Sequence, residues 1–284
     1  MTDSEISEWQ RSTEALQLSM SAMASELQLL RTTLDNVNAE LRGFRQASPE
    51  FGSVVRQILQ DVAENRLYVG AALLSAFTDV RLAGQVRAAI SSAEWLHENA
   101  DRAPTYSRRV EMLEALFPFI PADGDLAEFG VFTGAVTRFV RPRFMDRRYH
   151  AFDSWRGVPE AMSLSVAKYS FDLNGVIPEL PPETTIHAGW FDETIPKWRE
   201  QFEAPIAFAY IDCDLYESVK TVLEGLTDRI RPGTILAFDD WYNFPNWEAH
   251  SLKASREWAQ RHGIKMEPMG FTTLEHAGSF RITV

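Results

Sequence analysis

Two segments decide the fold of this chain: Ala207-Phe208-Ala209-Tyr210-Ile211-Asp212-Cys213-Asp214, and Ile235-Leu236-Ala237-Phe238-Asp239-Asp240. Each has the composition of a buried β-strand that ends in carboxylates. One helix-length segment, residues 215–231, lies between them and is ended by Pro232-Gly233. A strand, a helix and a strand in this order predict two parallel strands that lie next to each other in one sheet.

The acidic residues at these strand ends predict a metal site. Neighbouring strands lie roughly 5 Å apart, so Asp212, Asp239 and Asp240 should crowd together at the carboxyl edge of the sheet. Carboxylates that close repel one another unless one takes a proton or a cation joins them. A divalent ion that prefers oxygen ligands is the simplest solution. Asp214 is interpreted as a cap for the helix that follows; the alternative is a residue that supports the metal ligands.

Strand and helix signals alternate through residues 106–284. We predict strands at 125–129, 149–152 and 185–188, helices at 106–117 and 251–262, and a closing strand pair at 264–269 and 279–284. This alternation indicates an α/β fold with a doubly wound sheet. Ligands of such sheets bind at the carboxyl edge of the strands.

The turn after the first of these strands is glycine-rich, with Gly130 and Gly134 placed to let backbone approach a ligand. Phe132 stands where a dinucleotide fingerprint needs its second glycine, which disfavours a nicotinamide cofactor. Asp153, at the end of the next strand, stands where an acid binds ribose hydroxyls. Together they suggest an adenosine-type cofactor. The alternatives are a tight strand–helix turn and a helix cap at Asp153.

Composition limits the classes of partner. The net charge is −12 and the pI is about 5.0, which argues against nucleic acid or anionic lipid as the main partner. The single cysteine, Cys213, excludes an internal disulfide and is interpreted as a small strand-end residue. The acidic N-terminus has no signal-peptide pattern and no apolar run reaches the length of a membrane span, so a cytoplasmic location is expected.

The N-terminal segment, residues 1–46, carries a heptad repeat with apolar residues alternately three and four positions apart. The a positions are Ile6, Thr13, Met20, Leu27, Leu34 and Leu41, and the d positions are Trp9, Leu16, Met23, Leu30, Val37 and Phe44. This pattern predicts a parallel coiled coil and therefore a homo-oligomer; a surface helix packed on its own domain is the alternative. Residues 47–105 are predicted to be helical, either as a lid over the substrate pocket or as a layer between subunits.

Five blocks between residues 128 and 244 carry a resemblance to a known family. They are Glu-Phe-Gly-Val-Phe at 128–132, Phe-Asp-Ser-Trp-Arg-Gly-Val-Pro-Glu at 152–160, Gly-Trp-Phe-Asp-Glu-Thr-Ile-Pro at 189–196, Ile-Asp-Cys-Asp-Leu-Tyr-Glu-Ser at 211–218 and Phe-Asp-Asp-Trp-Tyr-Asn-Phe at 238–244. In order and spacing they resemble the macrocin O-methyltransferase (TylF-like) family of class I S-adenosylmethionine-dependent methyltransferases. The resemblance covers residues 106–284.

The resemblance implies a Rossmann-like sheet with an antiparallel last strand and methylation of a hydroxyl, often on a sugar. It places Mg2+ on Asp212, Asp239 and Asp240, with Asp212 also as base. The residues that it implies for S-adenosylmethionine are Glu128, Gly130, Gly134, Thr137, Asp153, Ser154, Gly189, Trp190 and Asp212. The sequence departs from the family after Gly134, where Ala135 and Val136 replace a Gly-Ser or Gly-Thr pair.

The chemistry favours an O-methyltransferase that acts on a saccharide or glycosylated small molecule. A sugar hydroxyl does not ionise unaided at neutral pH, and coordination to a dication lowers its pKa. His250 is a second candidate base on the acceptor side; a polar surface group is the other interpretation. Two alternatives stay open: a metal-free methyltransferase with another hydroxylated or aromatic acceptor, and a coiled-coil assembly protein with a degenerate cofactor-binding domain.

Overall fold

The computed structural model describes residues 80–159 and 170–283, which fall within one compact unit, Ala76–Val284. The heptad repeat and residues 47–79 lie outside the described residues, and the predicted division into 1–46, 47–105 and 106–284 stays a prediction. Among the described helices, none is long and apolar enough to cross a membrane.

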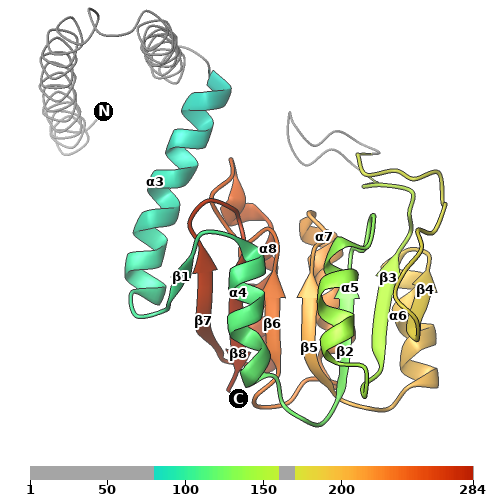
Figure 1. Cartoon of the computed structure of the whole chain (residues 1–284). Coiled ribbons are helices and arrows are strands. Elements are labelled where there is room, and N and C mark those ends of the chain that lie inside the picture. Colours follow the sequence, from blue (N-terminus) through green and yellow to red (C-terminus); the bar gives the residue numbers. More distant parts are fainter. Residues whose placement is uncertain (1–79, 160–169, 284) are drawn as a thin grey trace, which may run out of the picture. The chain divides into compact units, whose positions relative to one another are not determined.

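An eight-stranded sheet forms the centre of the described region, in the order β1-β7-β8-β6-β5-β2-β3-β4 (Figure 1). The strands are β1 (Thr105–Tyr106), β2 (Asp125–Phe129), β3 (Tyr149–Asp153), β4 (Thr184–Ala188), β5 (Ile206–Ile211), β6 (Ile235–Phe238), β7 (Met266–Thr272) and β8 (Gly278–Ile282). β5 and β6 are parallel neighbours, with Ile211 opposite Phe238, which confirms the predicted strand–helix–strand unit. β8 is antiparallel to both β6 and β7.

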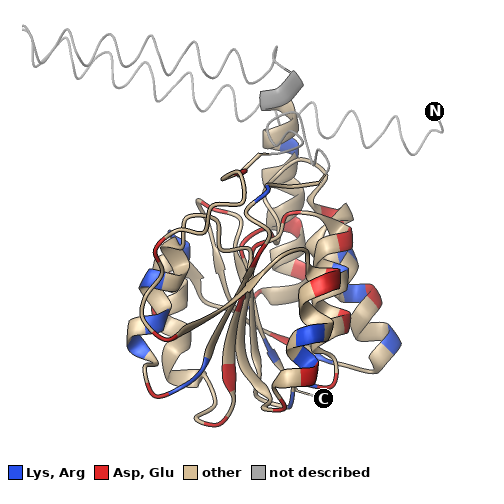
Figure 2. Cartoon of the chain, turned by 90° about the vertical axis from the view of Figure 1, so that its right-hand side faces the viewer, with Lys and Arg blue, Asp and Glu red and all other residues tan. Residues whose placement is uncertain are grey.

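Helices cover both faces of the sheet, which confirms the doubly wound fold. The helices are α3 (Val80–Ala100), α4 (Arg109–Leu116), α5 (Ala135–Val140), α6 (Phe191–Gln201), α7 (Tyr216–Leu226) and α8 (Ser251–His262). Residues of α4 and α5 share one apolar core with one face, and residues of α6, α7 and α8 share the other core with the opposite face. In the edge-on view the sheet lies between these two layers (Figure 2).

Two predicted helix boundaries were wrong, each because a tertiary contact competes with the helix. Tyr106 pairs with Thr272 in β1 instead of starting a helix. α7 ends at Leu226, five residues before Arg231, because the Arg229 carbonyl accepts the amide of Ile206 at the start of β5. The sequence interpretation also missed one helix, α6, which begins directly after the turn at residues 189–190.

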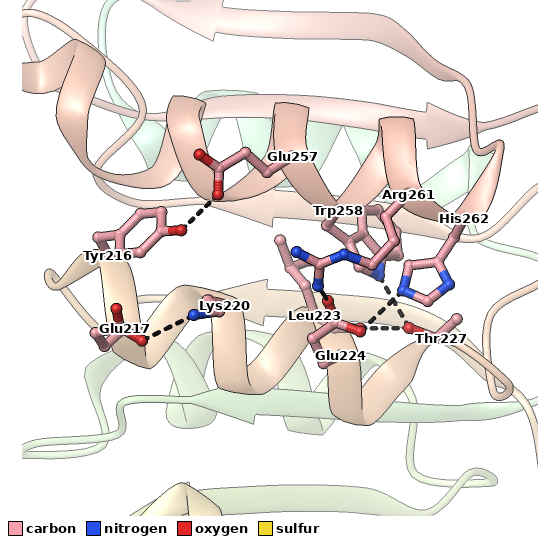
Figure 3. Close-up of polar contacts among 10 residues, drawn as sticks. All are labelled: Tyr216, Glu217, Lys220, Leu223, Glu224, Thr227, Glu257, Trp258, Arg261 and His262. Atoms are coloured by element: carbon pink, nitrogen blue, oxygen red, sulfur yellow. Dashed lines mark hydrogen bonds and ion pairs between the residues drawn. The ribbon is translucent and has the colours of Figure 1, made fainter.

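α7 and α8 pack against each other through buried apolar residues and a row of polar contacts (Figure 3). The indole Nε1 of Trp258 donates to Thr227 Oγ1 at 2.9 Å, and this hydroxyl donates in turn to the Leu223 carbonyl. Glu224 accepts from Arg261 and pairs with His262 at 2.8 Å. These contacts hold together the two helices that follow the acidic strand ends.

Candidate functional site

A cavity of about 510 Å³ lies at the carboxyl edge of the sheet. Such a volume is in the range of small-molecule sites, roughly 300–1,000 Å³. The chain runs outward from β2 through β3 to β4 and then crosses back to β5 on the other side of β2. The strand order therefore reverses between β2 and β5, and α/β sheets bind ligands at this switch point.

Gly130 forms the turn after β2 and lines the cavity. Its φ is +91°, and a Cβ built there would lie 1.6 Å from the carbonyl oxygen of Asp212. The Asp212 amide also donates to the Phe129 carbonyl at 2.7 Å. Only glycine therefore allows the turn and the acidic end of β5 to approach this closely.

Asp153, at the end of β3, is fixed by three backbone amides. Its Oδ2 accepts from Val131 and Phe132, both at 2.7 Å, and its Oδ1 accepts from Trp155 at 2.6 Å. Between residues 154 and 159 no helix begins, so the helix-cap alternative was wrong. The carboxylate lines the cavity beside Ser154 and also holds the glycine turn in place.

Gly189 and Trp190 line the same cavity, after β4. The Gly189 amide donates to the Asp153 carbonyl at 3.0 Å, which extends the ladder between β3 and β4 to the cavity wall. Gly189 has a φ of +138°. The turns after β2, β3 and β4 thus present five of the predicted cofactor residues to one side of the cavity: Gly130, Asp153, Ser154, Gly189 and Trp190.

Asp212 also lines the cavity, from the end of β5, whereas the predicted cofactor residues Glu128, Gly134 and Thr137 do not. Glu128 is buried on the opposite side of β2 from Phe129, where its Oε2 accepts from Thr137 Oγ1 at 2.6 Å and from Tyr149 OH at 2.7 Å. Burial raises the pKa of Glu128 to about 7. Gly134, with φ +80°, is the N-cap of α5 and contacts Leu180 rather than the cavity. Glu128, Thr137 and Gly134 therefore support the glycine turn after β2 from the side away from the cavity.

Asp212, Asp239 and Asp240 are brought together by the parallel pairing of β5 and β6. One carboxylate oxygen from each lies within 4.8 Å of the others, and all three residues line the cavity. A set of three carboxylates fits a hard divalent cation, which prefers oxygen ligands. The position of the cluster, directly beside Gly130, places it next to the glycine turn.

Arg109, at the start of α4, is a site residue that the sequence interpretation missed. Its Nη1 donates to Asp239 Oδ1 at 2.6 Å, and the same oxygen accepts from the hydroxyl of Tyr210. These two donors satisfy Oδ1 and leave Oδ2 of Asp239 for another partner. The signal for Arg109 was weak because 130 residues separate it from Asp239 in the chain.

The carboxylates of Asp212, Asp239 and Asp240 repel one another, and the positive charge of Arg109 alone does not neutralise them. Burial, followed by the charge of Asp239 and Asp240, raises the pKa of Asp212 well above its usual value. Burial and Asp239 likewise raise the pKa of Asp240. Arg109 is the one cation among the described residues that line the cavity. Protonation or a bound cation would relieve this repulsion.

Asp214 and His250 differ from their predicted roles. Asp214 lines the cavity with a φ of +57°, and α7 has Leu215 as its N-cap without a side-chain cap, so the cap interpretation of Asp214 was wrong. Burial raises the pKa of Asp214 to about 6. His250 is only 9% exposed, which contradicts a surface group, and it packs against Phe244 instead of lining the cavity, because α8 begins directly after it.

The sheet order, the antiparallel strand beside β6, the glycine turn and the acidic edge define a class I methyltransferase fold. Residues 127–241 match the family model described as a methyltransferase domain. This match confirms the resemblance drawn from the sequence blocks, and the chain carries a methyltransferase domain.

One curated relative is the 8-demethyl-8-(2,3-dimethoxy-alpha-L-rhamnosyl)-tetracenomycin-C 4'-O-methyltransferase of Streptomyces olivaceus. The two are 28% identical over 166 aligned positions, and the match covers 47% of this chain and 60% of the relative. The chain therefore spans about three fifths of the relative's length.

Two solved structures also show similarity to the chain. The calicheamicin methyltransferase CalS11 is 23% identical with a TM-score of 0.46, covering 66% of this chain and 85% of that one. The O-methyltransferase NovP is 23% identical with a TM-score of 0.45, covering 62% and 78%.

Proposed function

We propose that this protein is an S-adenosylmethionine-dependent, Mg2+-assisted O-methyltransferase that acts on a hydroxyl of a sugar or glycosylated small molecule. The observation that carries the proposal is a single cavity in which the glycine turn at Gly130, the fixed Asp153 and the three clustered carboxylates meet. The family match and the sugar O-methyltransferase named among the relatives support the same reaction class.

In this proposal the strand order divides the cavity into two halves. The donor half lies over β2, β3 and β4, where Gly130, Asp153, Ser154, Gly189 and Trp190 would hold the adenosyl donor. The acceptor half lies over β6 and the β7–β8 hairpin. Asp212, at the end of β5, stands between the halves, where it can accept the proton of the hydroxyl that is methylated.

Asp212, Asp239 and Asp240 would hold the metal ion. When bound, the ion would lower the pKa of the acceptor hydroxyl and orient it. Arg109 and Tyr210 hold one oxygen of Asp239 and so direct the other toward the cluster. Phe132 and Phe171, in edge-to-face contact at 5.4 Å, border the cavity and would shield the reacting atoms from water.

Replacing Asp212 tests the proposal. We expect Asp212→Asn to reduce transfer of labelled methyl to a panel of glycosides by at least about 100-fold, because the amide can neither take the proton nor complete the carboxylate cluster. Calorimetry should show S-adenosylhomocysteine still bound. Asp123→Asn, at a carboxylate with 90% exposure, is the matched control and should keep wild-type turnover. Wild-type rates in Asp212→Asn would refute the assigned role.

The metal-free reaction remains the alternative. It is favoured by the ion pair between Arg109 and Asp239, because a guanidinium already neutralises one carboxylate of the cluster. Removing the metal with a chelator distinguishes the two reactions. We expect turnover to disappear in EDTA and to return when magnesium is added in excess. Unchanged turnover after metal removal would establish the metal-free reaction instead.

Self-association through the heptads of residues 1–46 is proposed on the sequence pattern alone.

A further inference from the structure

Four residues of the acceptor half of the cavity lie outside the segment that matches the methyltransferase family. Gln85 comes from α3, Phe244 and Pro245 from the loop after β6, and His276 from the turn between β7 and β8. All lie before residue 127 or after residue 241. These four residues are therefore separate in sequence from those that line the donor half.

The part of α3 that follows Gln85 is held against the loop after β6, and Gln85 itself is an exposed residue that borders the cavity. The Ser91 hydroxyl accepts from Trp247 Nε1 at 2.9 Å, and the Ser92 hydroxyl accepts from the Asn243 amide at 2.8 Å. Trp95 lies edge-on to three aromatic rings, those of Trp241, Trp247 and Phe271, with centroids 5.7–6.2 Å away.

The position of His276 is held by hydrogen bonds to its carbonyl and by a ring contact. Its carbonyl accepts the amides of Trp241 and Tyr242, at 2.8 and 3.2 Å, which ties the hairpin turn to the segment directly after Asp240. Its ring meets the ring of Phe244 edge-on, with centroids 5.6 Å apart. The Nδ1 of His276 is buried without a hydrogen-bond partner among the described residues, so it is not the ring nitrogen that a ligand in the cavity would meet.

The four residues can bind a ring that carries hydroxyl groups, because they combine polar and apolar side chains. The amide of Gln85 and the imidazole of His276 can each donate or accept a hydrogen bond, and Phe244 and Pro245 offer an apolar surface for C–H groups. We propose that Gln85 and His276 determine acceptor specificity by binding hydroxyls of the acceptor's saccharide ring other than the one methylated. This inference rests on the proposed function and adds the residues that select the substrate.

The test compares glycosides with their deoxy analogues, each lacking one hydroxyl, using full-length enzyme and labelled methyl donor. We expect Gln85→Leu and His276→Leu to raise KM for the best glycoside about three- to tenfold with kcat within twofold, as for loss of one neutral hydrogen bond. Each variant should show no such rise with the one deoxy analogue that lacks its hydroxyl. Binding of S-adenosylhomocysteine should stay within twofold of wild type, which shows that the donor half is intact.

Matched controls are Gln260→Leu and His97→Leu, at exposed positions of α8 and α3 that do not line the cavity. The inference is overturned if the wild type methylates glycosides but the two cavity variants behave like these controls, or if their KM effects are the same with every deoxy analogue. A wild type that methylates no glycoside in the panel refutes the proposed function, and the inference with it.

Discussion

At the residue scale, Gly130 shows how one position without a side chain shapes the site. The same glycine supplies the turn over the donor half and lets the carbonyl of Asp212 approach the backbone. Phe132, two residues on, adopts a φ of +47° although it is not glycine, and its amide is held by Asp153. The carboxylate thus stabilises a backbone conformation that most side chains disfavour.

We expect Gly130→Ala to destabilise the protein by more than about 3 kcal/mol. The new Cβ would overlap the Asp212 carbonyl, and the alanine would have to adopt a positive φ. Gly263→Ala is the matched control. Gly263 also has a positive φ, +66°, but a Cβ there has no neighbour within 4 Å, so its cost should be about 1 kcal/mol. Urea denaturation measures both, and equal losses would contradict the overlap argument.

At the element scale, short-range patterns predicted most of the strands and the helix at 251–262 within a few residues. β2 and α8 have the predicted bounds, because a buried parallel strand and an amphipathic helix have distinct periodicities. The ends of the other elements depended on partners distant in the chain. β1 exists because Thr105 pairs with Phe271, 166 residues away, and nothing in the local sequence indicates that pairing.

The polar contacts between α7 and α8 lead to a prediction at this scale (Figure 3). We expect Thr227→Val to destabilise the protein by about 1–3 kcal/mol, because the indole N–H of Trp258, which is 1% exposed, loses its acceptor. Thr221→Val on the same helix is the control: its hydroxyl bonds only to the Glu217 carbonyl one turn earlier, so the change should stay within about 0.5 kcal/mol. Thermal or chemical unfolding of both variants decides the matter, and similar losses would count against the role of the Trp258 bond.

At the scale of the whole molecule, two sets of buried groups affect stability in opposite directions with pH. Asp125 Oδ2, His150 and His187 form a hydrogen-bonded chain, with separations of 3.1 and 3.0 Å. Burial lowers the pKa of His150, and burial together with the charge of His150 lowers that of His187 to about 4. At the acidic edge, burial raises the pKa of Asp212 and Asp240.

The sign follows from proton uptake. The unfolded chain protonates His187 near pH 6.5, whereas the folded protein leaves it neutral until about pH 4, so this contribution to stability is present above pH 6.5 and is lost as pH falls toward 4. The buried carboxyl groups act oppositely, because the folded protein keeps protons that the unfolded chain releases, and stability falls as pH rises. The wild-type profile is therefore partly compensated.

We expect the free energy of unfolding of His187→Phe to fall less than that of the wild type when the pH is lowered from 7.5 to 5. The difference should be about 1 kcal/mol, smaller than the full shift implies because His187 is partly exposed. Denaturant unfolding of both proteins across this range gives the comparison. Parallel pH profiles would show that His187 titrates alike in the folded and unfolded chains.

The sequence by itself determined the alternation of strands and helices, the parallel pairing of β5 with β6, and the meeting of Asp212, Asp239 and Asp240. The reason is that parallel strands share one carboxyl edge, so residues at that point in each strand must converge wherever the chain runs between them. Only the tertiary structure placed Arg109 on Asp239, turned Glu128 and Thr137 away from the cavity, buried His250 and brought Gln85 and His276 to the cavity wall. Those outcomes depend on packing between elements far apart in the chain, which no local period or spacing records.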